Sequence, residues 1–143
     1  MTISNPSLTR PPAREVYNKF VKVLRTDTTA TIRAWLPKDA FLTGAWVIGY
    51  VASDAATTAT IGVGSTTSAN EYVSGYDVKA AATGEGVSGV GAAAVGSAFA
   101  TRLTSDKPLY VKYAESGTAS TTGGPWYIKL EYAMLGSGEL IDD

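Results

Sequence analysis

The feature that most constrains the fold lies in the last third of the chain, where two runs alternate strictly between apolar and polar residues. These are residues 107–115 (KPLYVKYAE) and 126–135 (WYIKLEYAML), with SGTASTTGG between them. Successive side chains of a β-strand point to opposite faces, so this alternation predicts two strands with one apolar face each, which we expect to form an antiparallel pair. The apolar face of the second run consists of Trp126, Ile128, Leu130, Tyr132 and Met134.

Earlier parts of the chain are also rich in β-forming residues. The runs are 17–25, 29–36, 41–52 and 57–64. A turn at residues 26–28 divides the first two, and Pro37 ends the second. The third run is the most apolar, and Gly44 and Gly49 within it indicate a bend or a bulge. The fourth run is interpreted as its hairpin partner.

The middle of the chain is less regular. Ser68 and Glu71 have the spacing of a capping box, which predicts a short helix through Val73. Residues 83–91 contain four glycines and predict a connection that is either flexible or rich in left-handed backbone conformations. Residues 92–102 suit a helix by propensity and a strand by context, and we favour the strand.

These elements predict an all-β chain, an antiparallel two-sheet sandwich of about eight strands with at most one short helix. A length of 143 residues fits one domain with a sizeable core. We expect an extended N-terminal arm over residues 1–14, the sandwich over 15–136, and a flexible acidic tail over 137–143.

The composition argues against several classes of function. The chain has no histidine and no cysteine, so the commonest general base, the commonest metal ligand and any disulfide are missing. A net charge of −1 offers no basic field for nucleic acid. No apolar stretch is long enough to span a membrane and no signal peptide is evident, so we expect a soluble protein made in the cytoplasm.

Three patterns that form ligand-binding or catalytic sites in other proteins are not interpreted as such sites here. Gly84, Gly86 and Gly89 spell GxGxxG, but a dinucleotide site needs a strand before this motif and a helix after it. A pair of carboxylates can cleave glycosides without histidine, yet the acidic residues form no recognisable constellation. A calcium site assembled from distant loops stays open. We therefore predict no enzyme, no cofactor, no metal and no small-molecule substrate.

The aromatic residues are the more suggestive candidates for binding. Tyr110 and Tyr127 are out of phase with the core residues of their strands, which suggests exposure on one sheet and a role in an interface. They are equally compatible with capping the edge of a core. An alternative function is glycan binding, in which Trp126 or Tyr72 would stack on sugars.

The two ends of the chain carry opposite charge. Residues 1–25 have a net charge of +4, whereas the tail has −3 from Glu139, Asp142 and Asp143. The arm contains Pro6, Pro11 and Pro12, which favour an extended backbone. It is interpreted either as a disordered, solvated terminus or as an arm that orders against an acidic neighbour.

Two stretches resemble the small jelly-roll decoration, or cement, proteins that coat the heads of tailed bacteriophages. They are residues 61–86 (IGVGSTTSANEYVSGYDVKAAATGEG) and residues 107–135 (KPLYVKYAESGTASTTGGPWYIKLEYAML). In similar phage proteins, a strand that ends in glycine leads into a short turn-helix element, and a long hairpin closes the sandwich. The resemblance covers most of the chain after the arm and thins over residues 89–102.

The resemblance implies a jelly-roll-like sandwich on the outer capsid surface of a virion, synthesised in the host cytoplasm. Its partners would be the major capsid protein and further copies of itself, as a homodimer or homotrimer, and it carries over no catalytic or ligand residue. The function expected is to stabilise contacts between major capsid subunits. The alternative is a glycan-binding or structural module of a phage tail or fibre. The candidate contact residues, taken from the arm and the two strands, are Ile3, Leu8, Arg10, Pro11, Pro12, Arg14, Tyr110 and Tyr127.

Overall fold

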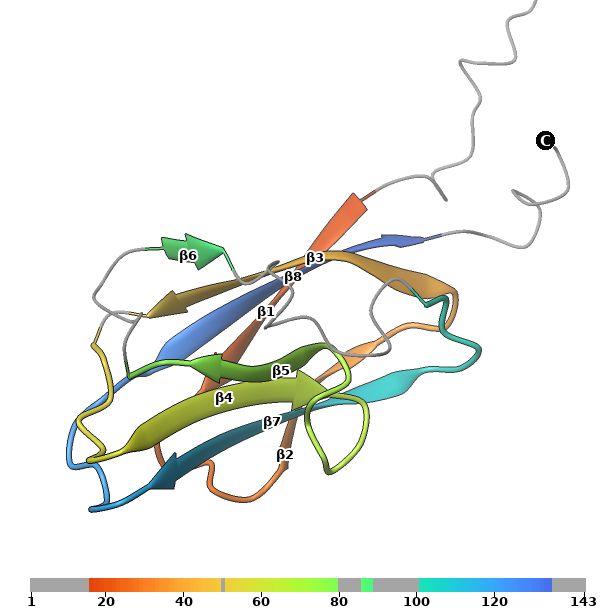
Figure 1. Cartoon of the computed structure of the whole chain (residues 1–143). Coiled ribbons are helices and arrows are strands. Elements are labelled where there is room, and N and C mark those ends of the chain that lie inside the picture. The colour runs from red at the N-terminus through yellow and green to blue at the C-terminus, as the bar shows by residue number, and fades with distance from the viewer. Residues whose placement is uncertain (1–15, 50, 80–85, 89–100, 135–143) are drawn as a thin grey trace, which may run out of the picture.

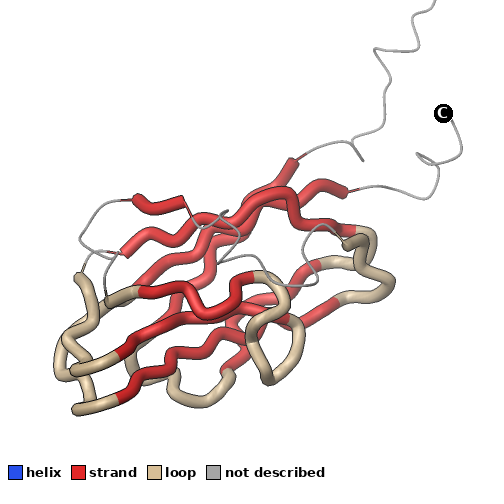
Figure 2. Tube along the Cα trace, in the orientation of Figure 1, coloured by secondary structure: helices blue, strands red, loops and turns tan. Residues whose placement is uncertain are grey.

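All regular secondary structure that the computed structural model describes is β-strand, as Figure 1 and Figure 2 show. The structure describes residues 16–49, 51–79, 86–88 and 101–134. Within them lie eight strands: β1 (Val16–Val23), β2 (Thr31–Leu36), β3 (Ala40–Gly49), β4 (Thr58–Gly64), β5 (Val73–Asp77), β6 (Gly86–Ser88), β7 (Lys107–Ser116) and β8 (Trp126–Met134). The prediction of an all-β fold is confirmed.

The strands form two four-stranded antiparallel sheets that face each other (Figure 1). Sheet A has the order β1-β8-β3-β6, and sheet B has the order β2-β7-β4-β5. β1 pairs with β8, β2 with β7, β3 with β6 and β4 with β5, as in one long hairpin. Rolling that hairpin up brings β3 against β8 and β4 against β7. This is the strand order of a jelly roll.

Two of the predicted pairings are wrong. β7 and β8 lie in different sheets, so they do not form the antiparallel pair that their alternation suggested. β3 and β4 also lie in different sheets, so residues 57–64 are not the hairpin partner of residues 41–52. Alternation shows that one face of a strand is buried, but it does not specify the neighbouring strand. The connection after β7 is long enough to cross to the other sheet.

The core lies between the inner faces of the two sheets. β8 buries Trp126, Ile128 and Leu130 completely and Tyr132 almost so, which confirms its predicted apolar face. Sheet B contributes the fully buried side chains Leu36, Ile61, Val63, Leu109, Val111 and Tyr113. A bulge in β3 between Leu42 and Gly44 confirms the irregularity expected there. β2 ends at Leu36, directly before Pro37, as predicted.

The segment between β4 and β5 is a loop, so the predicted short helix over residues 68–73 is wrong. The carboxylate of Glu71 accepts hydrogen bonds from the hydroxyl and the N–H of Thr66. These bonds stabilise a loop turn in place of the first turn of a helix. Ala69 has a φ of 50°, in the left-handed region that an α-helix does not contain.

Several other predictions fall partly or wholly outside the described residues. Gly86–Ser88 form β6, so the flexible connection predicted over residues 83–91 is wrong for these three. Residues 101–102 belong to a loop, not to the predicted strand. The remainder of the segments 83–91 and 92–102, the arm and the acidic tail lie outside the described part of the chain.

Candidate interaction surfaces

The acidic side chains of the described residues are engaged in local hydrogen bonds. Thr43 Oγ1 donates to Glu131 Oε1 over 2.8 Å, and Ser120 N donates to Glu115 Oε2 over 2.7 Å. Within the described ranges, no three acidic residues gather to hold a metal ion. No helix of that part of the chain is long and apolar enough to cross a membrane. The candidate functional sites are a loop cluster at one end of the sandwich, the outer faces of the two sheets and a groove near β1 and β2.

One end of the sandwich holds a polar loop cluster centred on Asp54. Its carboxylate accepts hydrogen bonds from the N–H of Thr122 at 2.9 Å, and from the hydroxyl and N–H of Thr121 at 2.7 and 2.8 Å. Led by the Thr122 N–H, these donors hold the pKa of the exposed Asp54 carboxyl far below its usual range. Asp54 thus joins the loop after β3 to the loop after β7.

Beneath this cluster, three buried hydroxyl groups meet. Tyr113 Oη lies 2.5 Å from Ser53 Oγ and donates to Ser120 Oγ at 3.3 Å. Ser53 and Ser120 are both less than a tenth exposed. These hydrogen bonds hold the two loops to the core through Tyr113.

The outer face of sheet A gathers exposed apolar side chains, and we call it the aromatic face. The strand register places Phe20 opposite Lys129, and Lys129 opposite Trp46. The same register places Tyr127 opposite Ile48 in the next row. These side chains share one surface because directly paired residues point to the same side of a sheet. Phe20 is 61% exposed, so the face can be buried against a partner.

Trp46 is held flat on this face. A Cβ on Gly44 would come within 2.5 Å of Trp46 Cη2, so the absence of a side chain at Gly44 makes room for the ring. Lys129 Nζ lies 4.6 Å from the ring centroid on the same face. The aromatic face therefore combines a fixed indole with a positive charge.

The two predicted contact tyrosines lie on opposite sides of the molecule. Tyr127 belongs to β8 in sheet A and Tyr110 belongs to β7 in sheet B, so the expectation that they share one sheet is wrong. Each is half-buried, and each alternates with core residues of its strand. A flat partner surface can contact only one of them at a time. The arm candidates lie outside the described residues.

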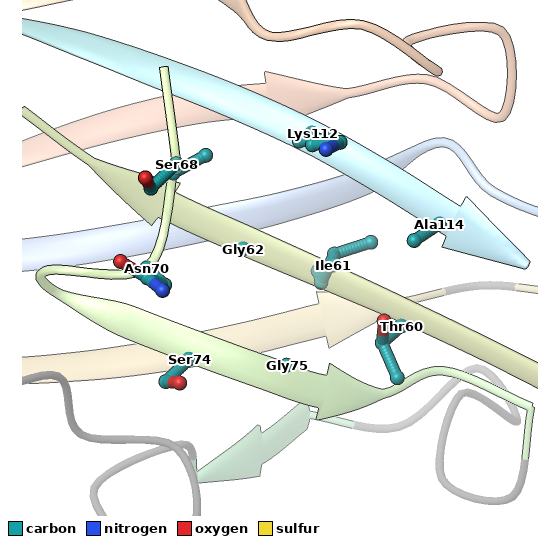
Figure 3. A pocket seen from close by; sticks show the side chains of 10 residues that line it. Thr60, Ile61, Gly62, Ser68, Asn70, Ser74, Gly75, Lys112 and Ala114 are labelled. Atoms are coloured by element: carbon teal, nitrogen blue, oxygen red, sulfur yellow. The ribbon is translucent and has the colours of Figure 1, made fainter. Parts of the chain in front are cut away.

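The outer face of sheet B carries a shallow polar hollow of about 270 Å³ (Figure 3). The loop after β4 lies so close to the sheet there that a Cβ on Gly62 would collide with the carbonyl oxygen of Ala69. Ser68 and Asn70 from this loop, Ser74 from β5 and Lys112 from β7 surround the hollow. None of the described residues that line it is aromatic, and aromatic rings are the side chains on which sugars commonly stack.

A third surface lies between the two sheets near β1 and β2, and we call it the aromatic groove. It has a volume of about 380 Å³ and is lined by Lys19, Trp35, Leu36, Pro37, Asp106 and Tyr132. Trp35 is 54% exposed. Tyr132 stacks on Tyr17, with 5.5 Å between the ring centroids and an interplanar angle of 25°.

The aromatic residues suggested for sugar stacking are not available for it. Trp126 is fully buried and Tyr72 is 1% exposed. The phase of Trp126 in its alternating strand indicated burial in the core. Phe20 and Trp35 were not among the candidates, although Phe20 is out of phase with Val21 and Val23 and could have been found by the same reasoning.

Comparisons with known proteins add one likeness. No family model matches the sequence, and no curated protein sequence matches it. A chain of the cyanophage Pam1 capsid asymmetric unit has a similar structure, with a TM-score of 0.60 and 22% sequence identity. The alignment covers 94% of this chain and 99% of that chain. At this level of identity the likeness establishes a shared fold.

Proposed function

We propose that this protein is a structural component of a bacteriophage head, a decoration or cement protein that binds the outer capsid surface and stabilises contacts between major capsid subunits. The observation that carries the proposal is the end-to-end likeness of its jelly roll to a chain of a phage capsid asymmetric unit. Jelly rolls occur in viral capsid proteins and also in lectins and cupins, so the fold alone does not decide the function.

The surface chemistry supports a role in assembly over a role in catalysis. The chain lacks histidine and cysteine, and the acidic groups described above support the loops. The aromatic face presents a large exposed ring, Phe20, beside the fixed ring of Trp46. Exposed aromatic side chains flanked by charge are typical of interface anchors. Neither the hollow on sheet B nor the buried Trp126 and Tyr72 favours the glycan-binding alternative.

The aromatic face, including Tyr127, is the surface that we assign to the shell. The arm, with Ile3, Leu8, Arg10, Pro11, Pro12 and Arg14, is assigned to a contact with the shell or with a sister copy. Tyr110, on the opposite face, would contact a neighbouring copy. Many copies on a regular lattice multiply weak contacts by avidity, so each interface can be modest.

Co-sedimentation with cognate undecorated heads tests this proposal. We expect saturable binding near an integral ratio to the major capsid protein and a higher temperature of shell rupture. Phe20→Glu should weaken binding at least tenfold, whereas Val51→Glu, a change at an exposed apolar residue of the loop after β3, should leave it unchanged. Failure of the wild-type protein to bind heads would overturn the proposal.

The contribution of the arm is measured in the same assay. Deleting residues 2–14 should leave a folded domain that no longer stays on the shell. If the variant that lacks residues 2–14 occupies the shell as fully as the wild type, the arm does not contribute to shell binding. The role of the aromatic face is still tested by Phe20→Glu.

A further inference from the structure

The aromatic groove is lined by aromatic, apolar and charged side chains. Its walls come from both sheets: Lys19 and Tyr132 belong to sheet A, and Trp35 belongs to sheet B. Behind the groove, Tyr17 stacks on Tyr132, which is itself only 9% exposed. The groove therefore has the exposed indole of Trp35 on one side and the edge of the supported Tyr132 ring on the other.

Trp35 is the natural anchor of this groove. It is 54% exposed, and on its own sheet it is paired with Pro108. Partly exposed tryptophans in a concave apolar setting carry a large share of binding energy when a partner removes them from water. Proline-rich segments are the ligands that aromatic-lined grooves commonly select, because their extended backbone loses little entropy on binding.

The sequence supplies such a segment next to the groove. The fifteen residues before β1 include Pro6, Pro11 and Pro12, and they join the described chain at Val16, one residue before Tyr17. Resting on the role of the arm in the proposed function, we propose that the proline-rich arm of one copy docks in the aromatic groove of a neighbouring copy.

A neighbouring copy suits the geometry better than the same chain. The restricted φ of Pro11 and Pro12, and the extended preference of the residues before them, favour an extended arm over one that folds back into its own groove. In an extended polyproline conformation the arm spans roughly 45 Å, at about 3.1 Å per residue. This length is enough to cross to an adjacent molecule of this size.

Charge adds a polar contact to the apolar one. Asp106 lines the groove, and its Oδ1 accepts a hydrogen bond of 2.8 Å from the Lys38 N–H. The exposed carboxylate can pair with Arg10 or Arg14 of an incoming arm. Exchange of arms around a rotation axis closes a dimer or a trimer, because every copy offers one arm and one groove.

Sedimentation equilibrium of the full chain in the absence of heads tests the inference. We expect concentration-dependent association of the wild-type protein, and at least tenfold weaker association for Trp35→Ala and for the chain lacking residues 2–14. Val51→Ala is the matched control, since Val51 is an exposed apolar residue outside the groove. It should associate like the wild type. Circular dichroism establishes that each variant is folded.

The outcomes separate this inference from the proposed function. A wild-type protein that stays monomeric at high concentration, or a folded Trp35→Ala variant that associates normally, would overturn the arm exchange. Head binding by such a protein would leave the capsid role standing. Association that depends on Trp35 together with no binding to heads would support the exchange and overturn the capsid role.

Discussion

The ring of Tyr113 stacks on the ring of Trp126 across the interior, with centroids 5.4 Å apart and planes 9° from parallel. Tyr113 belongs to β7 in sheet B, and Trp126 is the first residue of β8 in sheet A. The stack therefore joins the two sheets at the end that carries the polar loop cluster. Tyr113 also reaches Ser53 with its hydroxyl, so core packing and loop position are linked through one side chain.

Replacement of Trp126 should be among the most damaging substitutions in the core. Trp126→Ala leaves a large cavity and should lower the free energy of unfolding by about 3–5 kcal/mol. Trp126→Phe keeps a ring on Tyr113, and Trp126 Nε1 has no hydrogen-bond partner among the described residues, so the loss should be smaller. Urea denaturation measures both. Equal losses for the two variants would contradict the stacking account.

Glycine at position 62 is required by the loop that lies on sheet B. Gly62→Ala directs a Cβ into the backbone oxygen of Ala69 and should cost about 2–3 kcal/mol of unfolding free energy. Gly75→Ala is the matched comparison: Gly75 has a φ of 63° and an added Cβ would meet open space, so only backbone strain of about 1 kcal/mol applies. If chemical denaturation shows that Gly75→Ala lowers the free energy of unfolding more than Gly62→Ala does, the close contact between Gly62 and the Ala69 loop is contradicted.

Asp54 should make the stability of the loop cluster depend on pH. Its pKa is lowered in the folded state by the Thr122 and Thr121 donors, so the stabilisation is present above the ordinary aspartate pKa of about 3.9. It is lost as the pH falls toward the lowered folded-state pKa. The difference in Tm between the wild type and Asp54→Asn should therefore be largest above about pH 5 and shrink below about pH 4.

Thr118→Val is the control for this pH dependence. Thr118 lies in the same loop, but its hydroxyl is not among the groups that lower the pKa of Asp54. Its Tm profile should follow that of the wild type. A Tm difference for Asp54→Asn that stays constant from pH 7 to strongly acidic conditions would show that the charge of Asp54 contributes nothing.

Asp27 holds the turn that carries the chain from sheet A to sheet B. Its nearly buried carboxylate accepts hydrogen bonds from Leu24 N at 2.8 Å and Arg33 Nη2 at 2.5 Å. Asp27→Ala should cost about 2–3 kcal/mol of unfolding free energy, because it leaves a guanidinium and an amide without their acceptor. Arg102→Ala, which breaks the more exposed pair with Asp39, should cost about 1 kcal/mol or less. Thermal denaturation that reverses this order would contradict the assignment.

The sequence predicted which faces are buried better than it predicted which strands are neighbours. The alternation of β8 correctly placed Ile128 and Leu130 in the core, because period-two patterning records burial directly. The alternation could not show that β7 and β8 lie in different sheets, because the pairing of strands depends on how the whole chain folds into the jelly roll. The capping-box prediction failed because Glu71 bonds back to Thr66, a contact that a loop allows equally well.

The candidate surfaces were predicted less completely. Tyr127 was correctly expected to alternate with core residues, but the aromatic groove was missed. Its walls, Trp35 and Tyr132, are almost a hundred positions apart in the sequence and belong to different sheets. Only the arrangement of β1 and β2 at the same side of the sandwich brings them together, and no local pattern encodes that arrangement.

The most direct test of the capsid role is a cryo-electron microscopy reconstruction of cognate heads saturated with this protein. The account predicts jelly-roll density on the outer surface at an integral ratio to the major capsid protein, with Phe20 and Trp46 of the aromatic face against the shell. Heads without added density after saturation, or density confined to the tail, would contradict it.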